Sequence, residues 1–96
     1  MGDNMENIDI LKQRQARLRE DITAMLDSYL IGSISNPPSL AGFNLTTKVD
    51  GKTTTIYVRK NLVPMAIEMS KHYKEIWLLL QKLSKTNWEI LKLENE

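Results

Sequence analysis

Hydrophobic side chains recur at steps of three and four residues along the first third of the chain. The positions are Ile8, Leu11, Gln15, Leu18, Ile22, Met25 and Tyr29, of which Gln15 alone is polar. This spacing places one apolar stripe on a helix, in the heptad pattern of helices that pack on one another. Neither Gly nor Pro interrupts the run between Ile8 and Gly32, and a glycine is well suited to end a helix. The pattern predicts a helix over about residues 7–30.

The middle of the chain changes to loop residues and then to strict alternation. Residues 31–41 contain Pro37 and Pro38 among serines, which predicts a loop. From Phe43 onward apolar and polar residues alternate as far as Asp50-Gly51, a dipeptide typical of the two-residue type I′ turn. The pattern therefore predicts a β-hairpin over residues 42–59.

A two-residue turn at Asp50-Gly51 determines which residues of the two strands face each other. One face then pairs Phe43 with Val58, Leu45 with Ile56 and Thr47 with Thr54, and the other pairs Asn44 with Tyr57, Thr46 with Thr55 and Lys48 with Thr53. The first face is the more apolar, so we expect it to be the buried one.

A second repeat of threes and fours occupies the last third of the chain. Its members are Leu62, Ala66, Met69, Tyr73, Ile76, Leu80, Leu83, Asn87 and Ile90. Asn61 is a suitable N-cap, and Pro64 is tolerated because the first helical turn has no internal hydrogen bond to lose. We predict a helix over about residues 62–92.

These elements predict an α+β fold in a single domain over residues 1–96: a long helix, a β-hairpin and a second long helix. A two-stranded hairpin is marginal in water unless its apolar face is covered. We therefore expect the two helices to pack antiparallel, with the hairpin against them.

The last helix carries more apolar surface than one partner helix can bury. We expect the surplus to bind a second copy of the chain or another protein, and the interface candidates are Tyr73, Trp77, Leu80, Trp88 and Leu91. In the alternative, the helix bends and the hairpin covers this surface within a monomer. Gln15 and Asn87 interrupt the two stripes with amides, which either fix the helix register or lie where the stripes meet solvent.

Charge is unevenly distributed along the chain despite a net charge of +1. Three acids lie in residues 1–9, three acids and one lysine lie in residues 89–96, and residues 10–88 therefore carry a net charge of +6. A basic two-stranded ribbon fits the DNA major groove. The candidate nucleic-acid-binding residues are Lys48, Lys52, Thr53, Thr55, Arg59 and Lys60. The alternative is an ordinary solvated hairpin, since threonine favours strands and lysine protects strand edges.

The composition offers little for catalysis. The chain has no cysteine and one histidine, His72, which has Glu68 and Glu75 within helical reach but no second histidine. We read His72 as a surface residue, and Trp77 and Trp88 as packing or interface residues in preference to base-stacking ones. We predict no enzyme activity, no catalytic residue, no cofactor, no metal and no small-molecule substrate. No run of about 20 apolar residues exists for a membrane span, so a cytoplasmic location is expected.

The hairpin and last helix resemble a family of small bacterial proteins of unassigned function encoded in mobile-element, transposase-associated settings. The residues that carry the resemblance are Asp50-Gly51-Lys52-Thr53 leading to Tyr57-Val58, then Leu80-x-x-Leu83-Ser84-x-x-Asn87-x-x-Ile90-Leu91. Family members commonly have a cysteine-containing segment before the first strand, where this chain has residues 33–41, so no metal-related role is carried over. The resemblance implies an accessory protein that acts on nucleic acid or on a nucleic-acid-processing partner.

Overall fold

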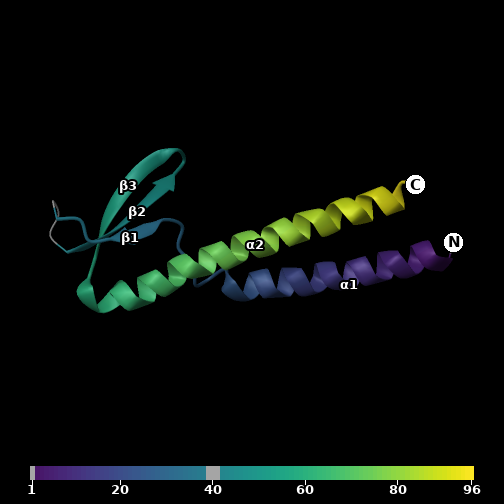
Figure 1. Ribbon diagram of the computed structural model, residues 1–96, viewed down its shortest axis with the longest axis horizontal. Coiled ribbons are helices and arrows are strands. Elements are labelled where there is room, and N and C mark those ends of the chain that lie inside the picture. Colours follow the sequence, from purple (N-terminus) through teal and green to yellow (C-terminus); the bar gives the residue numbers. More distant parts are fainter. Residues whose placement is uncertain (1, 39–41) are drawn as a thin grey trace. The chain divides into compact units, whose positions relative to one another are not determined.

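The computed structural model describes residues 2–38 and 42–96, with side chains from Asn7 onward in those ranges. The protein is of the α+β class, with one helix, a three-stranded antiparallel sheet and a long second helix (Figure 1). The elements in chain order are α1 (Gly2–Met25), β1 (Ser33–Ser35), β2 (Phe43–Val49), β3 (Lys52–Val58), the 3₁₀ turn η1 (Lys60–Leu62) and α2 (Val63–Glu94).

The chain divides into two compact units. The helical unit comprises residues 1–27 and 75–96, and the sheet unit comprises residues 28–74. The long helix α2 contributes to both, because its residues up to Lys74 belong to the sheet unit and those from Glu75 belong to the helical unit. The expectation of a single domain stays a prediction.

The first helix begins and ends earlier than predicted, over Gly2–Met25 in place of about 7–30. The backbone N–H of Leu26 donates to the carbonyl of Thr23 at 3.3 Å, a three-residue spacing that tightens and closes the last turn. The predicted glycine cap at Gly32 is therefore wrong. Gly32 has a φ of 137° and lies beside β2.

The residues after α1 bond to α2 within the sheet unit. The backbone N–H of Leu30 donates to the carbonyl of Met69 at 3.0 Å. The rings of Tyr29 and Tyr73 stack with centroids 6.4 Å apart and planes inclined by 23°. Tyr29 fits the heptad spacing of α1, but it lies beyond the end of this helix at Met25 and contacts α2.

The predicted loop over residues 31–41 contains a short strand, so that prediction is wrong at Ser33–Ser35. This strand, β1, pairs antiparallel with β2 and places Ile34 opposite Leu45. Three residues are too few to show an alternating pattern, and the strand forms because the edge of β2 offers it backbone partners. Residues 39–41 of the predicted loop lie outside the described residues.

The hairpin prediction is confirmed over Phe43–Val58, including its register. All six predicted cross-strand pairs are present between β2 and β3. Asp50 and Gly51 have φ angles of 52° and 79°, the two positive values that a type I′ turn requires. The turn chemistry of two residues therefore fixes the pairing of both strands.

The core of the sheet unit lies where the hairpin base meets the start of α2. Leu45 of β2 and Val58 of β3 are buried with Val63 and Ala66 of α2. The apolar face of the hairpin is less buried than predicted, because Ile56 is 47% exposed and Thr54 is also exposed. Burial is confined to the base, and the tip around the Asp50-Gly51 turn is solvated.

The second helix begins at Val63, one residue later than predicted, and ends at Glu94. The predicted N-cap at Asn61 is wrong, because Asn61 lies inside η1 and Arg59 occupies the capping position of that turn without a side-chain hydrogen bond. The 3₁₀ turn gives the chain its transition from β3 to the helix.

The helical unit brings α1 beside the C-terminal part of α2, with the chain ends at the same end of this unit (Figure 1). Gln15 Nε2 donates to Asn87 Oδ1 at 2.8 Å, and Lys12 Nζ lies 3.4 Å from Glu94 Oε2. The two amides that interrupt the heptad stripes are thus each other's partners, at an exposed position. The buried residues of this unit are Leu11, Leu18, Ile22, Ile76, Thr86 and Ile90.

The buried side of α2 differs from the predicted stripe at two positions. Leu80 is 40% exposed and Asn87 is exposed, while Leu79 is half-buried and Thr86 is only 3% exposed. From Ile76, a step of three leads to Leu79 and a step of four leads to Leu80. Either step continues an apolar stripe with helical periodicity. The order through Leu80 looked more apolar because threonine is a weak core signal, but the structure buries the order through Leu79 and Thr86 more deeply.

Thr86 provides a test of this assignment. Its Oγ1 donates to the carbonyl of Lys82 at 2.9 Å, so the hydroxyl is satisfied within α2 and its methyl group contributes to the core. We expect Thr86→Ser to lower the free energy of unfolding by about 1 kcal/mol through loss of the methyl group. Thr86→Val keeps the shape and should equal or exceed wild type. Urea unfolding followed by circular dichroism measures both, and equal effects of the two variants would contradict the assignment.

Candidate binding surfaces

The first candidate surface is a line of exposed residues on α2, here called the outer stripe: Trp77, Leu80, Ser84, Trp88 and Leu91. Successive members are three, four, four and three residues apart, so they share one side of the helix. Trp77, Trp88 and Leu91 are 55%, 59% and 54% exposed. Four of the five predicted interface residues thus lie together on a solvent-facing side of α2.

The fifth predicted interface residue, Tyr73, is placed differently. It is half-buried, and its ring stacks on Tyr29 within the sheet unit. Leu78 is 52% exposed but lies off the outer stripe, because one residue turns a helix by about 100°. The structure therefore separates the outer stripe from its apolar neighbours in sequence.

The second candidate surface is the hairpin. All six predicted nucleic-acid-binding residues are exposed. The strand alternation places Lys48, Thr53 and Thr55 on one face near the turn and Lys52 on the other. Arg59 and Lys60 follow the far end of β3, about 24 Å from Lys52 at 3.4 Å per residue. The predicted basic surface is thus two separate groups, one at the tip and one at the base.

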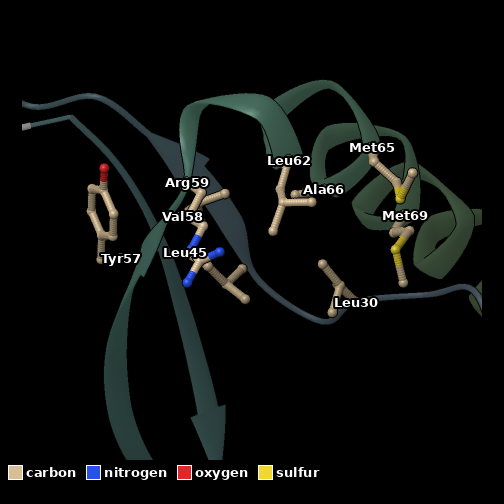
Figure 2. A pocket seen from close by; sticks show the side chains of 9 residues that line it. All are labelled: Leu30, Leu45, Tyr57, Val58, Arg59, Leu62, Met65, Ala66 and Met69. Carbon is tan, nitrogen blue, oxygen red and sulfur yellow. The ribbon is translucent and has the colours of Figure 1, made fainter.

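The third candidate surface is a pocket of about 380 Å³ in the sheet unit, between the base of the hairpin and the first turns of α2 (Figure 2). Its walls are apolar except for the Arg59 guanidinium and the Tyr57 hydroxyl. The lining residues are Leu30, Leu45, Tyr57, Val58, Arg59, Leu62, Met65, Ala66 and Met69. This volume is near the lower limit of small-molecule sites and suits one apolar side chain or a short alkyl group.

Sequence reasoning missed this pocket. Leu62 and Met65 are 45% and 63% exposed on successive turns. The excess of apolar residues at the start of the second helix was the signal in the sequence that could have indicated this pocket. Arg59 alone is charged among its lining residues. The lining therefore offers binding chemistry and no proton-transfer pair.

His72 is half-buried and has a structural partner, in contrast to its interpretation as a surface histidine. Its Nδ1–H donates to the carbonyl oxygen of Ser28 at 2.6 Å, because a carbonyl oxygen only accepts. Glu68, a residue within helical reach of His72, instead pairs with Lys71 at 3.7 Å. His72 thus ties the chain after α1 to α2 within the sheet unit.

Among the described residues, no three histidine, cysteine or acidic side chains form a group that could hold a metal ion. No helix in the described ranges has both the length and the apolar content to cross a membrane. Comparison of the chain with protein-family models, curated proteins and solved structures gives no match.

Proposed function

We propose that this chain is a non-enzymatic interaction module that acts by protein–protein binding. The observation that carries the proposal is the outer stripe, which holds two tryptophans more than half exposed on one side of α2. When a partner covers large apolar side chains, the binding free energy gains about 25 cal/mol for each Å² of apolar surface removed from water. Tryptophan is also among the residues most often found at the energetic centres of protein interfaces.

The helical unit supplies the rigid support that such an interface needs. In our proposal α1 and α2 pack antiparallel along their shared length, as the pairs Lys12–Glu94 and Gln15–Asn87 suggest by their opposite order. The buried residues of α2 then hold the helix in place while the outer stripe faces the partner. A partner meets a preformed surface and loses little conformational entropy on binding.

The resemblance of the hairpin and last helix gives the biological setting of the proposal. In that setting the chain is an accessory or regulatory component of a bacterial or phage mobile-element nucleic-acid system, acting in the cytoplasm. Its partner is a second copy or another protein of the same system.

Substitution of the tryptophans tests the proposal. The wild-type chain is used to capture proteins from the native host, and the captured complexes are treated with nuclease. The captured partners should be lost with Trp77→Ala or Trp88→Ala and retained with Leu78→Ala. The binding is then measured between purified proteins, where each tryptophan change should weaken affinity at least 10-fold. Binding that survives both tryptophan substitutions would refute the proposed surface.

Direct DNA or RNA binding is a second candidate function, favoured by the exposed hairpin tip. Beyond the residues paired with β1, the hairpin is a two-stranded ribbon, the form that enters a major groove. Lys48, Thr53 and Thr55 provide cationic and hydroxyl donors on one face of it. These groups suit contacts to phosphate oxygens.

A salt titration distinguishes this second function. If Lys48, Lys52, Arg59 and Lys60 contact phosphates, changing all four to alanine should reduce affinity and flatten the plot of log affinity against log salt. For duplex DNA the slope should fall by about 0.9 for each phosphate that the variant no longer neutralises. The fold should be kept, because all four are exposed. No binding by wild type at ~50 mM salt, where phosphate attraction is strong, would exclude direct contact.

A further inference from the structure

The pocket at the base of the hairpin is formed within one compact unit. Every residue of its lining belongs to the sheet unit. Leu45, Val58 and Ala66 of the lining are buried core residues, so this part of the pocket is held by the packing of the sheet on α2. Leu30 is held by the hydrogen bond from its backbone N–H to the carbonyl of Met69. The pocket is therefore formed before a ligand binds, as is usual for small-molecule sites.

Arg59 provides the pocket with a cation that the chain itself leaves unpaired. Within the described residues, no hydrogen bond or ion pair engages the Arg59 guanidinium. The sheet unit contains six lysines and arginines but only two acids. Asp50 lies in the turn at the far end of the hairpin, and Glu68 pairs with Lys71 at 3.7 Å. The guanidinium is thus available to an anion from outside the chain.

We propose that this pocket binds a small aliphatic monocarboxylate, with the alkyl chain against the apolar lining and the carboxylate on the Arg59 guanidinium. The two groups match in shape, because a guanidinium and a carboxylate form two parallel hydrogen bonds. They also match in charge, whereas a phosphate monoester carries further negative charge that no second cation of the lining would neutralise. The inference goes beyond the proposed function, because no residue of the lining belongs to the outer stripe.

The volume of the pocket indicates the length of the alkyl chain. A water molecule takes about 30 Å³ of liquid volume and a methylene group is of similar size, so a pocket of about 380 Å³ holds roughly a dozen non-hydrogen atoms. Octanoate is slightly smaller than this limit. Met65 and Met69 line the pocket with unbranched thioethers, which adapt to the shape of a flexible chain. We therefore expect acids of about eight carbons to bind best.

The first turn of α2 adds to the preference for an anion. Met65 and Ala66 of the lining lie in this turn, where the helix dipole presents its positive end. The turn contains no acidic residue of its own. A carboxylate beside Arg59 is thus favoured by the guanidinium and also by the helix dipole.

Four probes test whether the site needs both the chain and the charge. Octanoate has both, octanol lacks the charge, acetate lacks the chain, and octylamine has the opposite charge. Titration of the full chain, followed by the methionine methyl resonances in NMR, should give a dissociation constant of about 0.1–1 mM for octanoate. Octanol should bind at least 3-fold more weakly, octylamine more weakly than octanol, and acetate not measurably.

The methionines also locate the bound acid. Octanoate should shift the methyl resonances of Met65 and Met69, whereas the methyl resonance of Met25, in the helical unit, should not move. Equal affinity for octanol and octanoate would refute the role of the carboxylate. Shifts of equal size at all three methionines would refute the pocket as the site.

Variants of Arg59 test the ion pair. Arg59→Gln should weaken octanoate binding about 3- to 10-fold and leave octanol binding unchanged, and Arg59→Lys should restore part of the loss. Lys60→Gln is the matched control, because it removes an adjacent exposed cation that does not line the pocket, and it should change the affinity by no more than about 2-fold. Circular dichroism checks that each variant is folded. Equal losses in Arg59→Gln and Lys60→Gln would reduce the effect to general attraction by a basic surface and contradict the site.

A series of acids tests the size of the pocket and the source of the carboxylate. From butanoate to octanoate, each added methylene should strengthen binding about 2- to 4-fold, and the gain should stop near ten carbons. Affinity that still rises at dodecanoate would indicate unspecific association and overturn the proposal. N-acetyl-leucine presents a six-carbon acid with a peptide group beside it. Tighter binding of N-acetyl-leucine than of hexanoate would identify the end of a protein chain as the source of the carboxylate and exclude a free acid.

Discussion

Gly32→Ala is expected to lower the free energy of unfolding of the sheet unit by about 2–4 kcal/mol. Gly32 has a φ of 137°, a conformation that side-chain-bearing residues rarely adopt. A Cβ atom there would also overlap the backbone oxygen of Thr46 and lie 3.0 Å from Cδ1 of Leu45. Because a carbonyl in a sheet cannot move without breaking strand pairing, β1 would separate from β2.

Gly51→Ala is the matched control for this prediction. Gly51 also has a positive φ, 79°, but beyond its two chain neighbours no heavy atom lies within 4 Å of a Cβ built on it. The cost should be limited to backbone strain, about 1 kcal/mol. Amide hydrogen exchange at Ile34, Leu45 and Ile56 measures both variants. Equal protection in the two would show that the close approach of Gly32 to β2 is of no consequence.

Ile90→Ala is expected to lower the free energy of unfolding of the helical unit by about 2–4 kcal/mol, whereas Leu91→Ala should change it by no more than about 0.5 kcal/mol. Ile90 is 6% exposed and its neighbour Leu91 is 54% exposed. Truncation at position 90 removes buried methyl groups and leaves a cavity, while truncation at 91 removes solvated atoms.

The pair of variants is best compared by urea unfolding at low protein concentration, so that association contributes nothing to the result. A large cost at Leu91 under those conditions would mean that the outer stripe is packed within a single chain. That outcome favours the alternative in which the monomer covers its own apolar surface.

Features determined by local chemistry could be predicted from the sequence. The hairpin register follows from Asp50-Gly51, since a two-residue turn leaves one way to pair the strands. The existence of both long helices follows from their periodicity. In contrast, the end of α1 and the strand β1 depend on contacts with α2 and β2, which the local sequence does not contain.

The binding surfaces also include residues that the sequence identified and residues that only the structure brings together. The sequence identified Trp77, Leu80, Trp88 and Leu91 as surplus apolar residues, but placed Leu80 in the buried stripe as well. Whether a helix packs through Leu79 or Leu80 depends on the partner helix, and the structure alone resolved it. The pocket assembles residues from four elements and from the connecting segments that hold Leu30 and Arg59, so no local pattern could have revealed it.

The division of the chain into two units has a consequence for the order in which they form during synthesis. The sheet unit is one continuous segment, so all of its residues have emerged once Lys74 has left the ribosome. The helix α1 precedes this segment, whereas its partner residues Asn87 and Glu94 follow it, and Asn87 lies 72 positions after Gln15. Contacts so distant in sequence form slowly. We therefore expect the sheet to form before α1 meets its partner residues on α2, so that Leu11, Leu18 and Ile22 stay exposed to chaperones in the interval.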